Sequence, residues 1–338
     1  MEGGEHLQDQ QTVQKIHRLV DDGTVPGVSW AMIDHSTVTA GVYGNEQLIP
    51  TVAPLIEGET YDVASLTKVI GTLSVILQLL AGHQLELNNS VREFIPEWQH
   101  PEVTIRHLLT HTSGITGYIP NRNQLNAADL TSALLKLDVG ENFGIKMVYQ
   151  DVNYLLLGWV AERILGWPIQ RLIQERVLTP LGMTDSTFHP VSPEHCVPTE
   201  NSATRGLLRG RVHDPKAAIL GEHCGSAGLF STKRDLVTFC RAYLNPTQAT
   251  GVLPVEWVTA LTQDWTPNQV GRSLGWALWE SQPQPVLWQT GFTGTALVID
   301  PATQRALVFL SNRIHPDAPN LPFLARRNDI IQSYIDEK

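Results

Sequence analysis

Ser65 and Lys68 stand three residues apart in the segment DVASLTKVIGT, residues 62–72, at the start of a long apolar stretch. Serine is a favoured helix N-cap, and a lysine in a first helical turn is often solvated. The residues after Lys68 are apolar on almost every side, however, which is typical of a buried helix. The helix dipole disfavours a cation there, so this lysine needs another reason. A serine nucleophile with a lysine base supplies that reason, and ordinary helix capping is the alternative.

Two further segments could supply the other groups that a serine nucleophile needs. The first, MVYQDVNYLLLG, places Tyr149, Asp151 and Asn153 where a loop enters a helix. The second, WQTGFTGT, is a strand that ends in a glycine-rich turn and contains Gln289, Thr290, Gly291 and Phe292. Serine is a poor nucleophile until a base takes its proton, and glycine lets a backbone run close to a substrate. Both segments are therefore candidate parts of one active site.

These three segments resemble the signature motifs of the serine β-lactamase and penicillin-binding-protein family, in its class C-like and esterase-like branch. That family has a Ser-x-x-Lys motif, a second motif with a tyrosine, and a Lys/His-Thr-Gly strand. Other stretches are similar to the same branch: TIRHLLTHTSGI at 104–115, LGMTDSTF at 181–188, VHDPKAAIL at 212–220 and SAGLFSTKRDL at 226–236. The resemblance covers roughly residues 12–312, with the motifs in the expected order.

The resemblance implies a site in a cleft between a sheet and a helical lobe, with Ser65 as nucleophile and Lys68 as base. Lys68 can take a proton only when it is neutral, which partial burial and nearby positive charge favour. Tyr149 would share protons with Lys68 and deliver one to the leaving group. The backbone N–H groups of Ser65 and Phe292 would form the oxyanion hole.

Two positions depart from the family pattern. The second motif is commonly Tyr-x-Asn, and here Asp151 stands in its third position. Asp151 could hold Lys68 charged or accept a hydrogen bond from substrate, but an ionised carboxylate cannot donate one. The third motif commonly begins with lysine or histidine, and here Gln289 precedes Thr290 and Gly291. Both changes make the site less suited to anionic acyl donors such as penicillins.

Hydrophobic periodicity predicts strands near both ends of the chain and helices between them. Helices are expected at 8–22 and 322–336 and throughout most of 72–205. Strands are expected at 28–34, 37–44, 273–281 and 285–291, and a hairpin over 295–313 with its turn at 300–304. This order predicts an α/β (α+β) fold of β-lactamase/transpeptidase type, an antiparallel sheet flanked by helices with an inserted helical lobe. The single domain, 1–338, would divide into a sheet lobe at about 1–70 and 210–338 and a helical lobe at about 71–209.

Composition excludes several classes of function. The chain has 338 residues and a net charge of −10 without basic runs, which argues against nucleic-acid binding. No apolar stretch reaches about 18 residues, so no membrane span is expected. The polar, acidic start does not resemble a secretory signal, and three scattered cysteines fit reduced thiols. A cytoplasmic location is therefore favoured, with a small-molecule or peptide-like substrate as the partner.

Other candidate residues favour structural roles. His107 and His111 have the i, i+4 spacing of zinc ligands but no glutamate between them, so neither a metal nor another cofactor is expected. Cys224 occupies a position where the Gly-x-Ser-x-Gly elbow of other hydrolases requires glycine. His213 and Asp214 could suggest a Ser-His-Asp relay, but the family resemblance implies that this pair is structural or lines the cleft.

The sequence as a whole predicts a serine hydrolase that forms an acyl-Ser65 intermediate on an ester, amide or lactam. Carboxylesterase-like or amidase activity is favoured over strong β-lactamase activity because of Gln289. A D-alanyl-D-alanine carboxypeptidase is the first alternative, and it would have to lie outside the cytoplasm. A penicillin-recognising module that is acylated without turnover is the second.

Overall fold

The computed structural model describes residues 10–249, 251–281, 283–318 and 320–337. Its largest feature is a seven-stranded antiparallel sheet in the order β10-β11-β12-β13-β1-β2-β3. The strands are β1 (Gly27–Asp34), β2 (Thr37–Gln47), β3 (Ala53–Pro54), β10 (Ala277–Trp279), β11 (Val286–Gly291), β12 (Thr295–Asp300) and β13 (Arg305–Ser311). Pairing of β1 with β13 joins the two ends of the chain in one sheet, as the sequence predicted.

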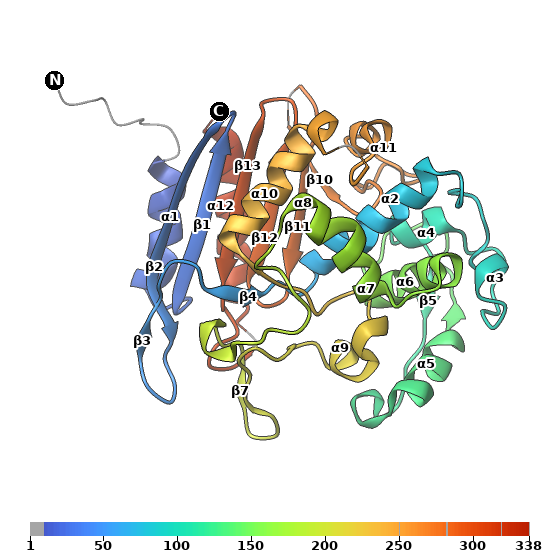
Figure 1. Cartoon of the computed structure of the whole chain (residues 1–338), viewed down its shortest axis with the longest axis horizontal. Helices are drawn as coiled ribbons and strands as arrows, with labels where there is room; N and C mark the ends of the chain where they lie inside the picture. Colours follow the sequence, from blue (N-terminus) through green and yellow to red (C-terminus); the bar gives the residue numbers. More distant parts are fainter. Residues whose placement is uncertain (1–9, 250, 282, 319, 338) are drawn as a thin grey trace.

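Helices cover both faces of this sheet (Figure 1). Helices α1 (Gln10–Asp21) and α12 (Pro322–Asp336) pack together against one face, and α10 (Lys233–Leu244) packs against the other. Alternate residues of β1 point to opposite faces, so Trp30 joins the core under α1 and α12 while Ile33 joins the core under α10. The nearly continuous burial of β1 therefore fits a sheet that is covered on both faces.

The middle of the chain is mainly helical and lies beside the sheet (Figure 1). Its longer elements are π-helix η1 (Lys68–Thr72), α2 (Leu73–Ala81), α3 (Val91–Phe94), α4 (Ile105–Leu109), α5 (Ala127–Leu135), α6 (Asp151–Leu165), α7 (Ile169–Ile173), π-helix η3 (Gln174–Leu178), α8 (Thr179–Leu181), α9 (Pro215–Leu220) and α11 (Val255–Ala260). Short 3₁₀ turns lie at η2 (Arg122–Gln124), η4 (Pro193–His195), η5 (Gly221–His223) and η6 (Pro246–Gln248). Helix α6 is buried from Val152 to Ala161, which explains its almost continuous apolar sequence.

Three small two-stranded sheets complete the fold. They pair β4 (Thr60–Asp62) with β9 (Phe230–Thr232), β5 (Ile115–Thr116) with β6 (Asp138–Val139), and β7 (Asn201–Ser202) with β8 (Gly206–Leu207). These strands are too short for an alternating pattern to reveal them in the sequence. The β4–β9 pair lies next to the Ser-x-x-Lys motif and leads the chain into Ser65.

The predicted elements agree with the structure except at their ends. Within the described residues α1 starts at Gln10, and residues 8 and 9 of its predicted range lie outside them. The strand predicted at 273–281 is shorter, since Gly275 has φ +87° and the chain turns there before β10. The division into lobes at residues 71 and 210 stays a prediction.

The described residues include no helix that combines the length and apolarity needed to cross a membrane. The three cysteines, Cys196, Cys224 and Cys240, are buried and form no disulfide. Burial raises the pKa of each of these thiols, which keeps them protonated and unreactive.

Candidate active site

Ser65 lies in a turn whose backbone is held in an unusual conformation. The preceding residue, Ala64, has φ +47°, in the left-handed region that side chains other than glycine rarely adopt. The Asp62 carboxylate supports this turn by accepting a hydrogen bond from the Ala64 N–H at 2.9 Å. The chain then enters π-helix η1 at Lys68, so Ser65 is not the N-cap of a regular α-helix. Single π-helical turns occur frequently at functional sites.

The turn between β11 and β12 is fastened to the segment just before Ser65. The hydroxyl of Thr293 donates to the carbonyl of Asp62 at 2.7 Å, and that of Thr295 donates to the carbonyl of Val63 at 3.1 Å. A Cβ at Gly291 would come within 2.5 Å of the Val63 oxygen, so only glycine permits this approach. The end of β11 is therefore held beside the turn that contains Ser65.

Two backbone donors are left without partners at this junction. Within the described ranges, neither the Ser65 N–H nor the Phe292 N–H donates a hydrogen bond inside the fold. Two hydrogen bonds from Arg313 hold the backbone around the Phe292 N–H in place. The Arg313 Nε donates to the Phe292 carbonyl at 2.7 Å, and its backbone N–H donates to the Thr293 carbonyl at 3.0 Å. Two fixed and unused N–H groups can stabilise an oxyanion.

Lys68 is buried and makes three hydrogen bonds, one for each proton of an ammonium group. Its Nζ lies 2.8 Å from each of three oxygens: Ser65 Oγ, the Ser226 carbonyl and Asp151 Oδ1. Burial alone would lower the pKa of Lys68, but the Asp151 carboxylate and the Tyr149 phenol outweigh burial and raise it above its ordinary value. Of the two possibilities that the sequence left open, a neutral Lys68 and a lysine that Asp151 holds charged, the structure favours the second.

Asp151 links Lys68 to a second lysine that the sequence reasoning missed. Lys216 Nζ lies 3.0 Å from Asp151 Oδ2 and 2.9 Å from Asp214 Oδ2. Burial alone would raise the pKa of Asp151, but Lys68 and Lys216 outweigh it and lower this pKa. Two lysines and two carboxylates thus compensate one another. Lys216 belongs to the stretch 212–220 that resembles the family, but nothing in its spacing indicated its role.

Tyr149 lies between Lys68 and Gln289. Its ring centroid is 5.3 Å from Lys68 Nζ, and its hydroxyl oxygen accepts a hydrogen bond from Gln289 Nε2 at 3.1 Å. The Gln289 side chain is only 4% exposed, and its Oε1 accepts a hydrogen bond from Arg272 at 3.4 Å. Gln289 therefore holds Tyr149 as well as lining the cavity.

The predicted residues surround one cavity of about 750 Å³. Those that line it are Ser65, Tyr149, Asp151, Gln289, Thr290, Gly291 and Phe292. Four arginines that the sequence reasoning missed also line it: Arg122, Arg272, Arg313 and Arg327. Burial and the neighbouring Arg313 lower the pKa of Arg327 to about 10. The absence of a cation at position 289 thus does not leave the cavity without cations, and the sequence argument against anionic acyl donors loses that support.

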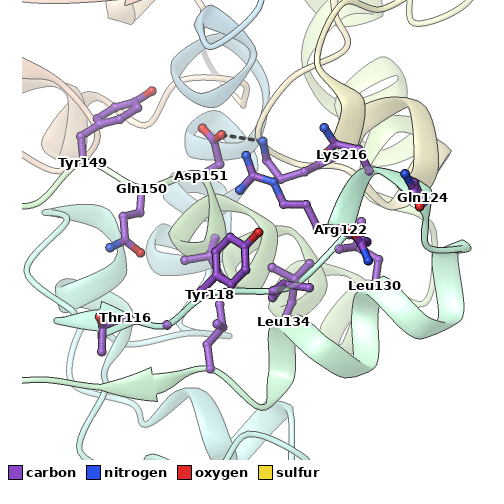
Figure 2. A pocket seen from close by; sticks show the side chains of 16 residues that line it. Thr116, Tyr118, Arg122, Gln124, Leu130, Leu134, Tyr149, Gln150, Asp151 and Lys216 are labelled. Carbon is purple, nitrogen blue, oxygen red and sulfur yellow. Dashed lines mark ion pairs between the residues drawn. The ribbon is translucent and has the colours of Figure 1, made fainter. Parts of the chain in front are cut away.

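A second pocket of about 800 Å³ adjoins this cavity (Figure 2). Four residues line both spaces: Arg122, Tyr149, Asp151 and Lys216. Figure 2 shows Leu130 and Leu134, from α5, beside the Asp151–Lys216 pair. Both leucines are buried and give the second pocket an apolar wall. A molecule bound in the first cavity would therefore have room to extend past Tyr149.

The family described as Beta-lactamase matches residues 12–327, nearly the whole chain. The protein belongs to the beta-lactamase family. This agrees with the resemblance seen in the three motifs and with the antiparallel sheet flanked by helices. The match extends about 15 residues beyond the end of the stretch over which the sequence resemblance was recognised, and so includes the first part of α12.

Several relatives are similar over most of the chain. A protein of Escherichia coli (strain K12) named "Putative D-alanyl-D-alanine carboxypeptidase" is 28% identical over 324 residues, which cover 81% of this chain and 73% of the relative. The solved structure of "EstCE1, a hydrolase with promiscuous acyltransferase activity" has a TM-score of 0.78 at 18% identity and covers 97% and 99% of the two chains. A class C beta-lactamase structure has a TM-score of 0.76 at 20% identity, covering 97% and 95%. The two structural similarities show the fold that these beta-lactamase-like proteins share.

The histidines considered as metal ligands make hydrogen bonds within this beta-lactamase fold. His107 Nδ1 accepts from the Thr104 N–H at 3.1 Å, and His111 Nδ1 lies 2.8 Å from Asn153 Nδ2. The described residues contain no group of three or more histidine, cysteine or acidic side chains that could hold a metal ion. Asn153 also bonds Ser113 and is fully buried, so it does not stand in for the asparagine of the second motif.

The remaining alternatives have structural partners as well. Asp214 caps α9 through the Ala217 N–H at 2.9 Å and pairs with Lys216. His213 instead lies 3.1 Å from a carboxylate oxygen of Glu200 and stacks on Phe292, so no Ser-His-Asp relay forms.

Proposed function

We propose that this beta-lactamase family member is a serine hydrolase that forms an acyl-Ser65 intermediate on ester, amide or lactam bonds. One observation carries the proposal: Ser65 Oγ lies 2.8 Å from Lys68 Nζ, beside the unused N–H groups of Ser65 and Phe292. The cavity at this point is large enough for a small acyl donor.

The hydrogen bonds of Lys68 determine how the serine loses its proton. Because the ammonium group already donates to three oxygens, it has no lone pair for the Ser65 proton. We therefore propose that the Tyr149 oxygen accepts that proton as its own phenolic proton passes to the leaving group, with Lys68 and Gln289 beside the phenol. As the Ser65 oxygen bonds to the carbonyl carbon, the carbonyl electron pair moves to oxygen, where the two N–H groups stabilise it.

Collapse of this tetrahedral species breaks the bond to the leaving group. The departing oxygen or nitrogen takes the former phenolic proton of Tyr149, so that acyl-Ser65 remains and Tyr149 keeps the proton from Ser65. A water molecule then gives its proton to Tyr149 and attacks the acyl carbon, and the same steps release the acid and restore Ser65. Lys68 stays an ammonium throughout and orients Ser65.

Carboxylesterase-like or amidase activity fits the site better than a specialised β-lactamase activity. The neutral amide of Gln289 binds Tyr149 directly, and the adjoining pocket has space for an extended acyl group with an apolar part. Neither feature requires a lactam ring.

Hydrolysis of p-nitrophenyl acetate tests this proposal. We expect sustained turnover that the Ser65→Ala variant loses, with the Ser113→Ala variant as a matched control that keeps it. An initial burst without a steady state would instead indicate a module that is acylated once, and no reaction at Ser65 would refute the proposal.

A D-alanyl-D-alanine carboxypeptidase is the second candidate, since Arg313 and Arg327 line the cavity and could bind a terminal carboxylate. The name of the Escherichia coli relative points in the same direction. Release of D-alanine from a peptide that ends in D-Ala-D-Ala, compared with the same peptide ending in an amide, distinguishes the two. Cleavage of the acid at least tenfold faster than the amide would support the carboxypeptidase, and equal rates would refute it.

A further inference from the structure

Arg272 is a buried cation beside Tyr149 that no described carboxylate compensates. Its side chain is 4% exposed, and its guanidinium carbon lies 5.4 Å from the Tyr149 ring centroid. It donates to the Gly275 carbonyl at 2.7 Å and to Gln289 Oε1 at 3.4 Å, while its Nε has no hydrogen-bond partner in the described part of the chain. Burying a charge without a counter-ion is costly, so its retention calls for a reason.

The other buried charges near Tyr149 balance one another. The charged and titratable groups that surround it are Lys68, Asp151, Lys216, His111, Tyr154, Arg272 and Arg122. Asp151 and Asp214 offset the two lysines. Burial, with Arg272 and Lys68 nearby, lowers the pKa of His111 well below its ordinary value and keeps it neutral. Arg122 is exposed, where water screens its charge, so the buried excess positive charge at Tyr149 comes from Arg272.

Arg272 also fixes which way the Gln289 amide points. An arginine side chain has only donors, so the Gln289 atom that faces it must be the carbonyl oxygen. The Gln289 NH₂ group is then directed at Tyr149, whose oxygen accepts the hydrogen bond at 3.1 Å. A Tyr149 oxygen that accepts a hydrogen bond from the Gln289 NH₂ group carries negative charge more favourably than one that has to donate to Gln289.

We propose that Arg272 is a positioning residue that acts through Gln289 and stabilises negative charge on the Tyr149 oxygen during catalysis. This inference rests on the proposed function. Position 289, where related motifs commonly carry lysine or histidine, is neutral in this chain. Arg272 instead places a cation at the Gln289 carbonyl oxygen, on the other side of this amide from the Tyr149 oxygen.

Combined substitutions at the two positions test this proposal. Arg272→Met should lower kcat/KM for phenyl acetate roughly 10- to 100-fold, because the charge near Tyr149 is lost. Gln289→Lys should also lower it, because a second cation is then placed beside Arg272. The double variant has one cation beside Tyr149 again and should exceed Arg272→Met at least fivefold.

The pH profile separates this charge effect from a loss of packing. Without the cation, the acid limb of kcat/KM should move to higher pH in Arg272→Met, because the loss of positive charge makes proton loss from the site harder. Arg272→Lys keeps the charge and should keep the limb near its original position, whereas Arg272→Gln should move it. This Lys/Gln pair carries the test if the Met variant does not fold.

If the effects of Arg272→Met and Gln289→Lys on kcat/KM simply multiply in the double variant, the role of Arg272 is overturned. The same holds if the acid limb lies at the same pH in Arg272→Lys and Arg272→Gln. Failure of the proposed function would look different, because wild-type protein would then show neither turnover nor a Ser65 adduct.

Discussion

The two sides of the proposed catalytic cavity differ in whether carboxylates pair with their cationic side chains. On the helical side, Lys68 and Lys216 lie 2.8–3.0 Å from the carboxylates of Asp151 and Asp214. On the side formed by the chain after β13, Arg313 donates to backbone carbonyls, and no described carboxylate pairs with it. The paired side holds fixed charges around the nucleophile, whereas the unpaired side leaves positive charge available to a ligand.

This difference predicts opposite responses to mutation. Removing one partner of a buried ion pair strands the other charge and is strongly destabilising. Removing a buried cation that has no counter-ion relieves a desolvation cost and can stabilise the fold. Substitutions on the two sides therefore test whether the paired and the unpaired cations affect stability with opposite sign.

The largest effect is expected at Lys68. Lys68→Ala should lower the rate of Ser65 acylation at least 100-fold, about the loss expected when a proton-transfer site is disrupted. The ammonium that orients Ser65 and stabilises charge on Tyr149 would be gone. Stopped-flow acylation by p-nitrophenyl acetate measures this rate, and circular dichroism checks the fold.

Tyr149→Phe serves as its companion. It should be slow with amides, whose leaving groups need a proton, and less affected with activated esters. Near-normal amide rates in both variants would show that the paired side does not perform the proton transfer.

Asp151→Asn should lower the stability of the fold, an effect that activity measurements alone do not detect. We expect the free energy of unfolding at pH 7 to fall by about 2 kcal/mol, since two lysines lose their shared carboxylate. The folded-state pKa of Asp151 is lowered, so its contribution is complete above the unfolded value near 4 and is lost as pH falls below it.

Urea unfolding at several pH values measures this contribution. The difference between wild type and Asp151→Asn should shrink as the pH is lowered from about 5 towards 3. A difference that stays constant over that range would contradict the ion-pair account.

The unpaired side should show a smaller effect of the opposite sign. Arg327→Met should raise the free energy of unfolding by about 1 kcal/mol, because burial and Arg313 disfavour its charge. The neighbouring Arg326 pairs with Asp22, so Arg326→Met is a matched control that should not stabilise. Destabilisation by Arg327→Met as large as that by Asp151→Asn would erase the proposed contrast.

Metal removal should have the smallest effect. Dialysis against EDTA is expected to leave the hydrolysis rate unchanged, since the paired charges are provided by side chains alone. A loss of activity that zinc restores would return attention to His107 and His111.

The sequence predicted the fold well because apolar runs mark its buried elements. The apolar runs of β1 and α6 are both buried in the structure. Gly291 could be predicted to lie in a close approach, because a glycine in a signature strand often marks one. The π-helix at Lys68 and the positive φ of Ala64 left no such pattern, since each depends on contacts with distant residues.

The charged surroundings of the site were the least predictable part. Asp151 was considered as a partner that could hold Lys68 charged, and the structure favours that possibility. Lys216, Arg272 and Arg313 come from three separate segments, and no spacing rule connects them with Ser65. The contact of Gln289 with Tyr149 was not predicted, because it requires two distant segments to meet.

Identification of the acylated residue tests the central claim most directly. The intact protein should gain one fluorophosphonate adduct, and peptide mass spectrometry should place it on Ser65, the serine that lines the cavity beside Lys68. Ser65→Ala should remove both the adduct and the turnover of p-nitrophenyl acetate. An adduct on Ser113 or Ser226, or undiminished turnover by Ser65→Ala, would contradict the account.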